Sequence, residues 1–491
     1  MIRNRRLTRR ELIRWAGMAG AGTIAASIAA CATPTPAPTA APTKAVAQPT
    51  TAPTAAPTTA PTKAPEPTKV PATPVPKAAG GYAIYPNTKG EITWWHWWGS
   101  PVRRNAVRRI IGAFNAIYPN IKVNETFVAW GDIWTKNIAA VAAGSGMPDV
   151  IGEDRPQLFV RAQNKVEISL AELCKRDGID GKAFWPFTWT EATVNGEPYG
   201  LPYETDIRVL FTNQYLLKEA GLDPEKPPKN WDELWTYADK LDKKGADGKL
   251  ACVAFWPTFG NIGFDQWIWN NGGEFVDKNQ NPTLNSKEAV ETLTWMKKWG
   301  DRYGKANWDA FSGAFGQGAQ DGFMSSRVAM KVDIAGYMSF LNFYDPRTAD
   351  KQRLLWSASP IPCAPGKKPA SLSGGFALSI PRGSKNIEPA WEFIKYAVFE
   401  GQASWARDTF AIPTIEKVAR EDPVLNADPK WKFFIDAMSY GRPAFTHPYY
   451  PSMLEVLGPA LDAVWAGKMT PQQALDEAQK KAEAEIAKNK K

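Results

Sequence analysis

Histidine and cysteine are scarce in this chain of 491 residues, which contains two of the first and four of the second. His96 and His447 lie far apart, and neither stands in the spacing of a metal-binding motif. A Gly-x-Ser-x-Gly nucleophile turn is missing, and Gly245 and Gly248 lack the spacing of a phosphate-binding loop. We therefore expect no metal, no cofactor and no catalysis of these kinds.

A long apolar run is missing as well, although the N-terminus has the pattern of an export signal. Six arginines precede an uncharged stretch from Trp15 to Ala30. This stretch is shorter than the roughly 20 residues that a membrane-spanning helix needs, so residues 1–30 are interpreted as a signal peptide. The pair Arg9 and Arg10 resembles a twin-arginine export signal, and an ordinary basic signal region is the alternative.

The segment around Cys31 predicts how the exported chain is held. Residues 28–31 read Ile-Ala-Ala-Cys and resemble a bacterial lipobox, so Cys31 is the predicted lipidation site; a cysteine that follows a cleavage site by chance is the alternative. Residues 31–80 are nearly all Pro, Thr and Ala, a composition that cannot bury a core and forms a disordered tether. At about 3.1 Å per residue, the tether reaches on the order of 100 Å. We expect an extracytoplasmic protein anchored to the cell membrane by lipid.

A strongly charged surface is not expected in the folded part. The formal net charge is +9, but the signal peptide carries six arginines and one glutamate, and the tether carries four lysines and one glutamate. The remainder is nearly neutral, which argues against nucleic acid as a partner.

The cysteines beyond Cys31 allow little cross-linking. Cys174, Cys252 and Cys363 remain, so at most one disulfide can form among them. A Cys252–Cys363 pair and buried free thiols are both open.

Strand and helix patterns alternate in residues 81–491. Residues 91–95 read as a strand, Ser100 and Pro101 as the start of a helix, and residues 121–123 as the next strand. This order is typical of an α/β protein, and about 400 residues are enough for two lobes between which the chain crosses more than once. Ligands of such sheets bind beyond the carboxyl ends of strands. The first helix is expected to bury Val107, Ile110, Ile111, Phe114 and Ile117.

Tryptophan is abundant, with 22 residues. Indole rings offer large flat contacts for sugar rings, and carboxylates beside them bind hydroxyl groups. In residues 94–98, strand alternation sends two tryptophans to each face, and Trp98 is the predicted exposed platform. Trp256, beside a proline in an expected loop, is a second candidate, whereas Trp267 and Trp269 are expected to pack internally.

A series of short motifs resembles, in family order, the extracellular solute-binding proteins of family 1. These are sugar receptors of ATP-binding-cassette (ABC) importers and include maltose-binding protein. The resemblance runs from Glu91 to the C-terminus, and it depends on the order of the motifs because none is specific by itself. The motifs are residues 92–95, 119–123, 145–150, 199–203, 210–213, 220–222, 230–234, 327–330, 374–380, 390–395 and 464–468.

The resemblance implies an α/β, two-lobed periplasmic-binding-protein-like fold of type II, with mixed sheets flanked by helices and a ligand cleft between the lobes. Lobe 1 would hold residues 82–206 and 375–440, and lobe 2 would hold residues 207–374 and 441–488. Ligand binding would close the lobes by a hinge motion, and the membrane permease would recognise the closed form.

The resemblance also places candidate ligand contacts at the ends of strands. Trp98 follows the first strand, and Glu153 and Asp154 stand where the third strand meets the cleft. Tyr203 and Glu204 stand at the first crossing, where Glu204 matches a position that binds sugar hydroxyls in maltose-binding protein. For each acid, a solvated loop charge is the alternative.

Further candidates follow later in the chain. Asp333 and Tyr337 lie where the family has an aromatic platform, but tyrosine stands here in place of tryptophan, which argues against a maltodextrin ligand. Gly374 and Gly375 would let the backbone approach the ligand closely, and a structural turn is the alternative.

These observations predict a monomeric binding protein that captures a sugar, short oligosaccharide or polyol and delivers it to the permease subunits of an ABC transporter. A secreted carbohydrate-active enzyme is an alternative, since Glu153 with Glu204, or Asp206 with Asp333, would supply the two carboxylates of a glycosidase. A structural adhesin and a receptor for a non-sugar polar solute are further alternatives.

Overall fold

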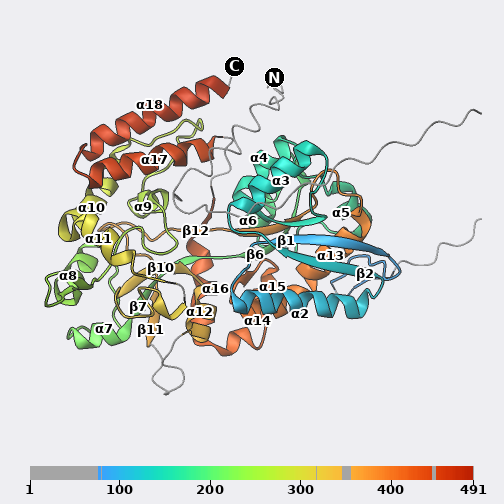
Figure 1. Cartoon of the computed structure of the whole chain (residues 1–491), viewed down its shortest axis with the longest axis horizontal. Helices are drawn as coiled ribbons and strands as arrows, with labels where there is room; N and C mark the ends of the chain where they lie inside the picture. Colours follow the sequence, from blue (N-terminus) through green and yellow to red (C-terminus); the bar gives the residue numbers. More distant parts are fainter. Residues whose placement is uncertain (1–75, 79, 317, 345–354, 445–448, 490–491) are drawn as a thin grey trace, which may run out of the picture.

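Two halves, each with its own sheet and hydrophobic core, make up the folded protein (Figure 1). The predicted signal peptide, Cys31 and most of the tether lie outside the residues that the structure describes. The computed structural model describes residues 76–78, 80–316, 318–344, 355–444 and 449–489.

The first half is built on a six-stranded mixed sheet in the order β14-β6-β13-β3-β1-β2. Strand β1 pairs in parallel with β2 and β3, whereas β13 is antiparallel to β3 and β6. Its elements are β1 (Gly90–His96), α2 (Pro101–Ile117), β2 (Ile121–Phe127), α3 (Asp132–Ala143), β3 (Val150–Asp154), α4 (Arg155–Gln163), α5 (Ala171–Asp177), α6 (Pro186–Glu191), β4 (Thr193–Val194), β5 (Glu197–Pro198), β6 (Leu201–Thr205), β13 (Gly375–Ser379), α13 (Ile387–Phe399), α14 (Gly401–Thr409), β14 (Ile412–Pro413), α15 (Glu416–Glu421), η3 (Leu425–Ala427), α16 (Pro429–Ala437) and η4 (Met438–Tyr440).

The second half has a smaller antiparallel sheet in the order β10-β7-β11, surrounded by helices (Figure 1). Its largest helices, α10, α17 and α18, pack together around a core rich in tryptophan. Its elements are β7 (Arg208–Asn213), α7 (Gln214–Glu219), α8 (Trp231–Leu241), β8 (Lys243–Lys244), β9 (Leu250–Cys252), α9 (Phe264–Asn270), α10 (Lys287–Tyr303), α11 (Lys305–Ser312), η1 (Gly318–Gln320), β10 (Met330–Ile334), α12 (Tyr337–Tyr344), β11 (Trp356–Ser359), β12 (Ser371–Ser373), β15 (Gly441–Pro443), α17 (Tyr450–Trp465) and α18 (Pro471–Asn489).

The predicted start of helix α2 is confirmed. Ser100 is its N-cap, and its Oγ accepts a hydrogen bond from the Arg103 N–H at 3.4 Å, with Pro101 in the first turn. Ile110 and Phe114 are buried as predicted. The prediction that Ile117 is buried is wrong, because this last residue of the helix is 46% exposed.

Three segments of the described chain connect the two halves. The first leads from β6 to β7 through residues 206–207, the second from β12 to β13 through Gly374, and the third from η4 into β15. β12 and β15 pair in parallel, so the second and third segments lie side by side. We call these segments the first, second and third crossing.

A third hydrophobic cluster joins the halves beside the crossings. Phe434 of α16 packs near Phe211 of β7, with ring centroids 5.9 Å apart. Trp431 belongs to the same cluster, together with Val209 of β7 and Tyr337 of α12. Helix α16 of the first half therefore also packs against the second sheet.

The three cysteines that the structure describes are buried free thiols. Burial raises the pKa of the Cys252 thiol to about 11 and that of the Cys174 thiol to about 12. Of the two alternatives for these residues, the structure contradicts the Cys252–Cys363 disulfide.

Candidate functional site

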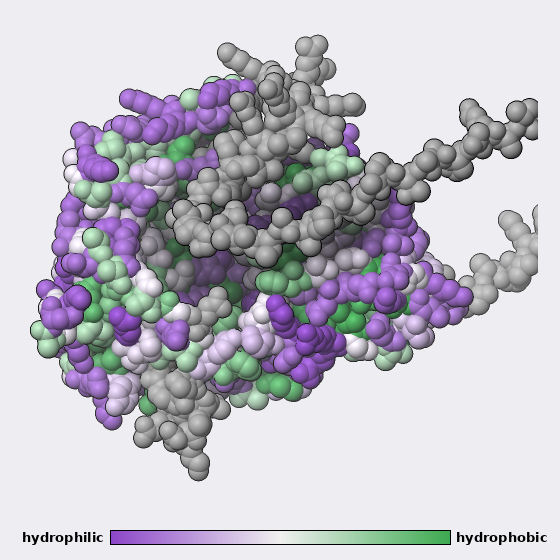
Figure 2. All heavy atoms as spheres, viewed as in Figure 1, coloured by the Kyte–Doolittle hydropathy of each residue, from purple (hydrophilic) through white to green (hydrophobic). Residues whose placement is uncertain are grey.

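A cavity of about 520 Å³ lies between the two halves. Its size is within the range of small-molecule sites, and Figure 2 shows this face of the molecule hollowed between the halves. Its lining comes from both halves and all three crossings. The lining residues are Trp97, Arg103, Trp130, Asp154, Pro156, Gln157, Glu204, Thr205, Asp206, Arg208, Asn261, Ile334, Leu372, Gly374, Gly375, Phe376, Ala411, Ala444 and Leu454.

Two tryptophans form an aromatic wall on the first half. Trp97 follows β1, and Trp130 follows β2 and is 57% exposed. Their rings meet edge to face, with centroids 4.6 Å apart and planes 85° apart. Phe376 of β13 lies beside Trp97, with centroids 4.8 Å apart. This wall offers the cavity an exposed indole in a fixed orientation.

The structure contradicts the exposure predicted for Trp98. Its side chain is fully buried, and alternation along the strand explains why, because Ile92 and Trp94 on the same face are core residues. Trp98 instead contributes to the site indirectly, because its Nε1–H donates a hydrogen bond of 3.3 Å to Oε1 of the lining residue Glu204.

Glu204 presents a carboxylate to the cavity from the end of β6. The Trp405 Nε1–H donates to its Oε2 at 2.6 Å, and Arg103 Nη1 of α2 lies 3.8 Å from its Oε1. Burial raises the pKa of Glu204, while Arg103 and the two indole donors oppose this shift. The carboxylate is therefore held by two indole hydrogen bonds and a nearby guanidinium.

Asp154 ends strand β3 and also lines the cavity. Burial and the nearby Glu191 carboxylate raise its pKa to about 7, against the opposing charges of Arg155 and Arg208. No group within the described residues donates a hydrogen bond to this carboxylate. Its acceptor capacity is therefore open to a ligand.

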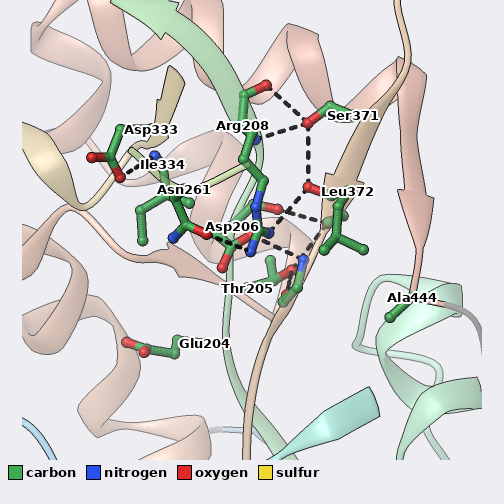
Figure 3. A network of polar contacts seen from close by, with 12 residues as sticks. Glu204, Thr205, Asp206, Arg208, Asn261, Asp333, Ile334, Ser371, Leu372 and Ala444 are labelled. Carbon is green, nitrogen blue, oxygen red and sulfur yellow. Dashed lines mark hydrogen bonds and ion pairs between the residues drawn. The ribbon is translucent and has the colours of Figure 1, made fainter. Parts of the chain in front are cut away.

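Hydrogen bonds connect the first crossing to the second (Figure 3). The Arg208 Nη1–H donates to Asp206 Oδ1 and, at 3.2 Å, to the Leu372 carbonyl. The Gly374 N–H donates to Asp206 Oδ1 at 2.9 Å. The Arg208 Nη2–H donates to Asn261 Oδ1 at 3.2 Å, which connects the crossings to the second half.

Both predicted glycines line the cavity, and Gly375 has a structural reason to be glycine. Its φ is +126°, and a Cβ there would lie 2.2 Å from the Glu204 carbonyl oxygen. The N–H of Gly374 is already used by Asp206. The close approach of the β6 backbone, together with the positive φ, accounts for glycine at position 375.

Five other predicted site residues do not line the cavity. Glu153 is buried in an ion pair with Arg161, Tyr203 is buried against Trp98 and Trp405, and Trp256 is stacked on Trp308 with centroids 4.8 Å apart. Asp333 pairs with Lys331 at 3.0 Å, and the Tyr337 hydroxyl donates to Asp321 at 2.7 Å. The five therefore act as packing or as internal pairs in this structure. They are Glu153, Tyr203, Trp256, Asp333 and Tyr337.

Several lining residues are not among the predicted site residues, although the sequence contains a signal for two of them. Trp130 follows the carboxyl end of β2, where ligands of α/β proteins are expected. Trp97 has the opposite parity to the buried Ile92. Arg103 and Arg208 had no such local signal, because their position at the cavity depends on packing between distant segments.

Two further observations concern membrane spans and metal ions. No helix among the described residues is both long enough and apolar enough to span a bilayer. In the same part of the chain, no cluster of three or more His, Cys, Asp or Glu side chains is arranged to hold a metal ion.

Comparison with known proteins identifies relatives over most of the folded part. The family profile of the bacterial extracellular solute-binding proteins matches residues 98–404. The solved structure of CpMnBP1 with mannotriose bound is similar, with a TM-score of 0.72 and 30% identity over 80% of this chain and 99% of that chain. The arabinooligosaccharide-binding protein of Bacillus subtilis strain 168 is 25% identical over 407 residues, 79% of this chain and 90% of the relative.

A probable ABC transporter-binding protein of Deinococcus radiodurans is also similar, with 28% identity over 315 residues, 60% of this chain and 70% of the relative. These similarities confirm the predicted two-lobed fold and the predicted family, and they mark a binding protein rather than an enzyme. The chain belongs to the bacterial extracellular solute-binding proteins.

Proposed function

We propose that this protein captures a neutral sugar or short oligosaccharide in the cavity between its halves and delivers it to the permease of an ABC importer. The observation that carries the proposal is that an exposed indole wall and two carboxyl groups line the same cavity. Trp130 and Trp97 offer aromatic surface, while Asp154 and Glu204 offer hydroxyl acceptors in the same cavity. This combination suits a ring with one apolar face and polar edges.

The charge of the cavity favours a neutral ligand over an anionic one. Two arginines and three carboxylates line it, and both arginines have carboxylate partners, Arg103 at Glu204 and Arg208 at Asp206. Asp154 adds a carboxyl group without a cation of its own. A phosphate or carboxylate ligand would therefore meet no unpaired cation among the described lining residues, and its desolvation would be poorly compensated.

The similar proteins support the same ligand class. CpMnBP1 was solved with mannotriose bound, and the Bacillus relative is an arabinooligosaccharide-binding protein. A cavity of about 520 Å³ leaves room for more than one sugar ring when the halves are apart. Since the ligand would contact both halves, its binding would favour the closed arrangement.

The proposal includes membrane anchoring. After export, lipid on Cys31 and the tether of residues 31–80 would hold the receptor beside its permease. Replacement of Cys31 by serine, Cys31→Ser, should abolish incorporation of an alkyne-labelled fatty acid and release the protein from membranes. Unchanged labelling of this variant would contradict the anchor.

A thermal-shift screen tests the ligand class. A chain that begins at residue 76 would be heated with mannotriose, arabinooligosaccharides, maltose, monosaccharides, polyols and glycerol phosphate. A ligand present at 100 times its Kd should add about 2.7 kcal/mol of stability. Stabilisation by a sugar that is recovered intact supports the proposal, whereas stabilisation by glycerol phosphate alone, or by nothing in the panel, contradicts it.

A further inference from the structure

One buried arginine contacts two of the segments that connect the two halves. Arg155, the first residue of α4, is fully buried. Its Nη1–H donates to the Glu204 carbonyl at 2.6 Å, and its Nη2–H donates to Thr205 Oγ1 at 3.2 Å. The same Nη2 also donates to the Gly374 carbonyl. One guanidinium thus binds the first and the second crossing.

Glu191 extends this contact to the third crossing. Its Oε2 accepts a hydrogen bond from Arg155 Nε at 3.0 Å, and its Oε1 accepts one from the Ala444 N–H at 2.9 Å. Ala444 follows β15 directly and lines the cavity. Glu191 itself is almost fully buried at the end of α6.

We infer that Arg155 and Glu191 are positioning residues that hold the three crossings in one register and thereby shape the ligand cavity. Neither side chain lines the cavity. The backbone groups that they bind belong to Glu204, Gly374 and Ala444, which all line it, and Arg155 also binds the hydroxyl of Thr205, another lining residue. Their effect on ligand affinity therefore passes through the backbone. For that readout alone, the inference depends on the proposed function.

The chemistry of the pair explains why lysine would not replace the arginine. The guanidinium is a planar fork that donates in several fixed directions, and here it serves three acceptors on two crossings and a carboxylate. A lysine ammonium is a point charge on a flexible stem, and its single nitrogen cannot reproduce four contacts that Arg155 makes from three separate nitrogens. Gly375 adds the close approach that lets the arginine reach both crossings, since a Cβ there would lie 2.8 Å from Arg155 Nη1.

The first half contains a matched control. Asp177 and Lys395 form another fully buried ion pair, with Nζ 2.6 Å from Oδ2, and they contact none of the three crossings. Asp177→Asn and Glu191→Gln both convert a buried carboxylate to an amide. A difference in behaviour between these two variants therefore reflects where each ion pair lies in the fold.

Hydrogen exchange on the full chain tests the inference without any ligand. In Arg155→Lys and Glu191→Gln, amides in residues 204–208, 371–375 and 441–444 should exchange at least about tenfold faster than in the parent. In Asp177→Asn, faster exchange should stay near residues 83–85 and 391–396. Exchange at the crossings that is the same in these variants as in the parent would overturn the inference. Exchange there that is equally fast in Asp177→Asn would overturn it as well. If Arg155→Lys does not fold, the result for Glu191→Gln decides.

Affinity provides the second readout, with mannotriose or whichever sugar stabilises the parent. Glu191→Gln should weaken binding at least about tenfold, whereas Asp177→Asn should bind like the parent. Equal affinities in the two variants would refute the positioning role. If no sugar binds the parent, the proposed function fails, and the exchange experiment still tests the inference.

Discussion

Asp154 should make the protein less stable as the pH rises, and its replacement by asparagine should remove this effect. Its pKa is raised from 3.8 to about 7 in the folded chain, chiefly by burial. Between these values the folded state keeps a proton that the unfolded state has lost, so the free energy of unfolding falls with pH and levels off above about 7. The shift corresponds to roughly 4 kcal/mol. Because the carboxyl group partly faces cavity water, we expect about 2 kcal/mol.

Urea denaturation at pH 5, 6.5 and 8 measures this contribution. Asp154→Asn should approach the parent in stability at pH 5 and exceed it by about 2 kcal/mol at pH 8, while binding sugar more weakly. Glu167→Gln is the control, since burial also raises the pKa of Glu167 to about 7 but this residue lies outside the cavity lining. Its stability difference should follow the same trend without loss of affinity. A difference between Asp154→Asn and the parent that stays constant from pH 5 to 8 would refute the reasoning.

Three further predictions concern other residues. Trp130→Ala should weaken sugar binding at least tenfold, about 1.4 kcal/mol, with little change in Tm; Tyr215→Ala, which removes a similarly exposed ring outside the cavity lining, should bind normally in calorimetry. Gly375→Ala should cost at least about 2 kcal/mol in urea denaturation because of its positive φ and close contacts, whereas Gly112→Ala, with open space around its Cβ, should be neutral or stabilising. Reductant should leave Tm unchanged, because the described cysteines are free thiols; a reductant-sensitive Tm would contradict this.

Local features of the fold could be predicted from the sequence because their causes are local. Residues 470–473 read Thr-Pro-Gln-Gln, the pattern of a capping box, and the box forms: the Gln473 N–H donates to Thr470 Oγ1, and Gln473 Oε1 accepts from the Thr470 N–H. The cap at Asn230 also forms, through hydrogen bonds from the next turn to its Oδ1. Strand β1 and helix α2 followed from periodicity for the same reason.

Contacts between distant segments could not be predicted in this way. Asp206 and Gly374 meet across 168 positions, and Arg155 meets Gly374 across 219. Such pairs depend on how β6 and β13 are aligned, and this register includes an irregularity between Phe376 and Ala377. The resemblance to the family places Asp154 and Glu204 at the cleft, near the ends of β3 and β6. The side chains that contact the Glu204 carboxylate, Trp98, Arg103 and Trp405, come from distant parts of the sequence.

The abundance of tryptophan is a weaker argument for a sugar than the position of two of its residues. Among the described lining residues of the cavity, only Trp97 and Trp130 are tryptophans, although the chain contains 22. Most of the others fill the two cores, where large rings pack against each other. Yet buried tryptophans still act on the site, since Trp98 and Trp405 direct their indole N–H groups at Glu204. The core thus fixes a carboxylate that faces the cavity, and the same residue type builds both the packing and the polarity of the site.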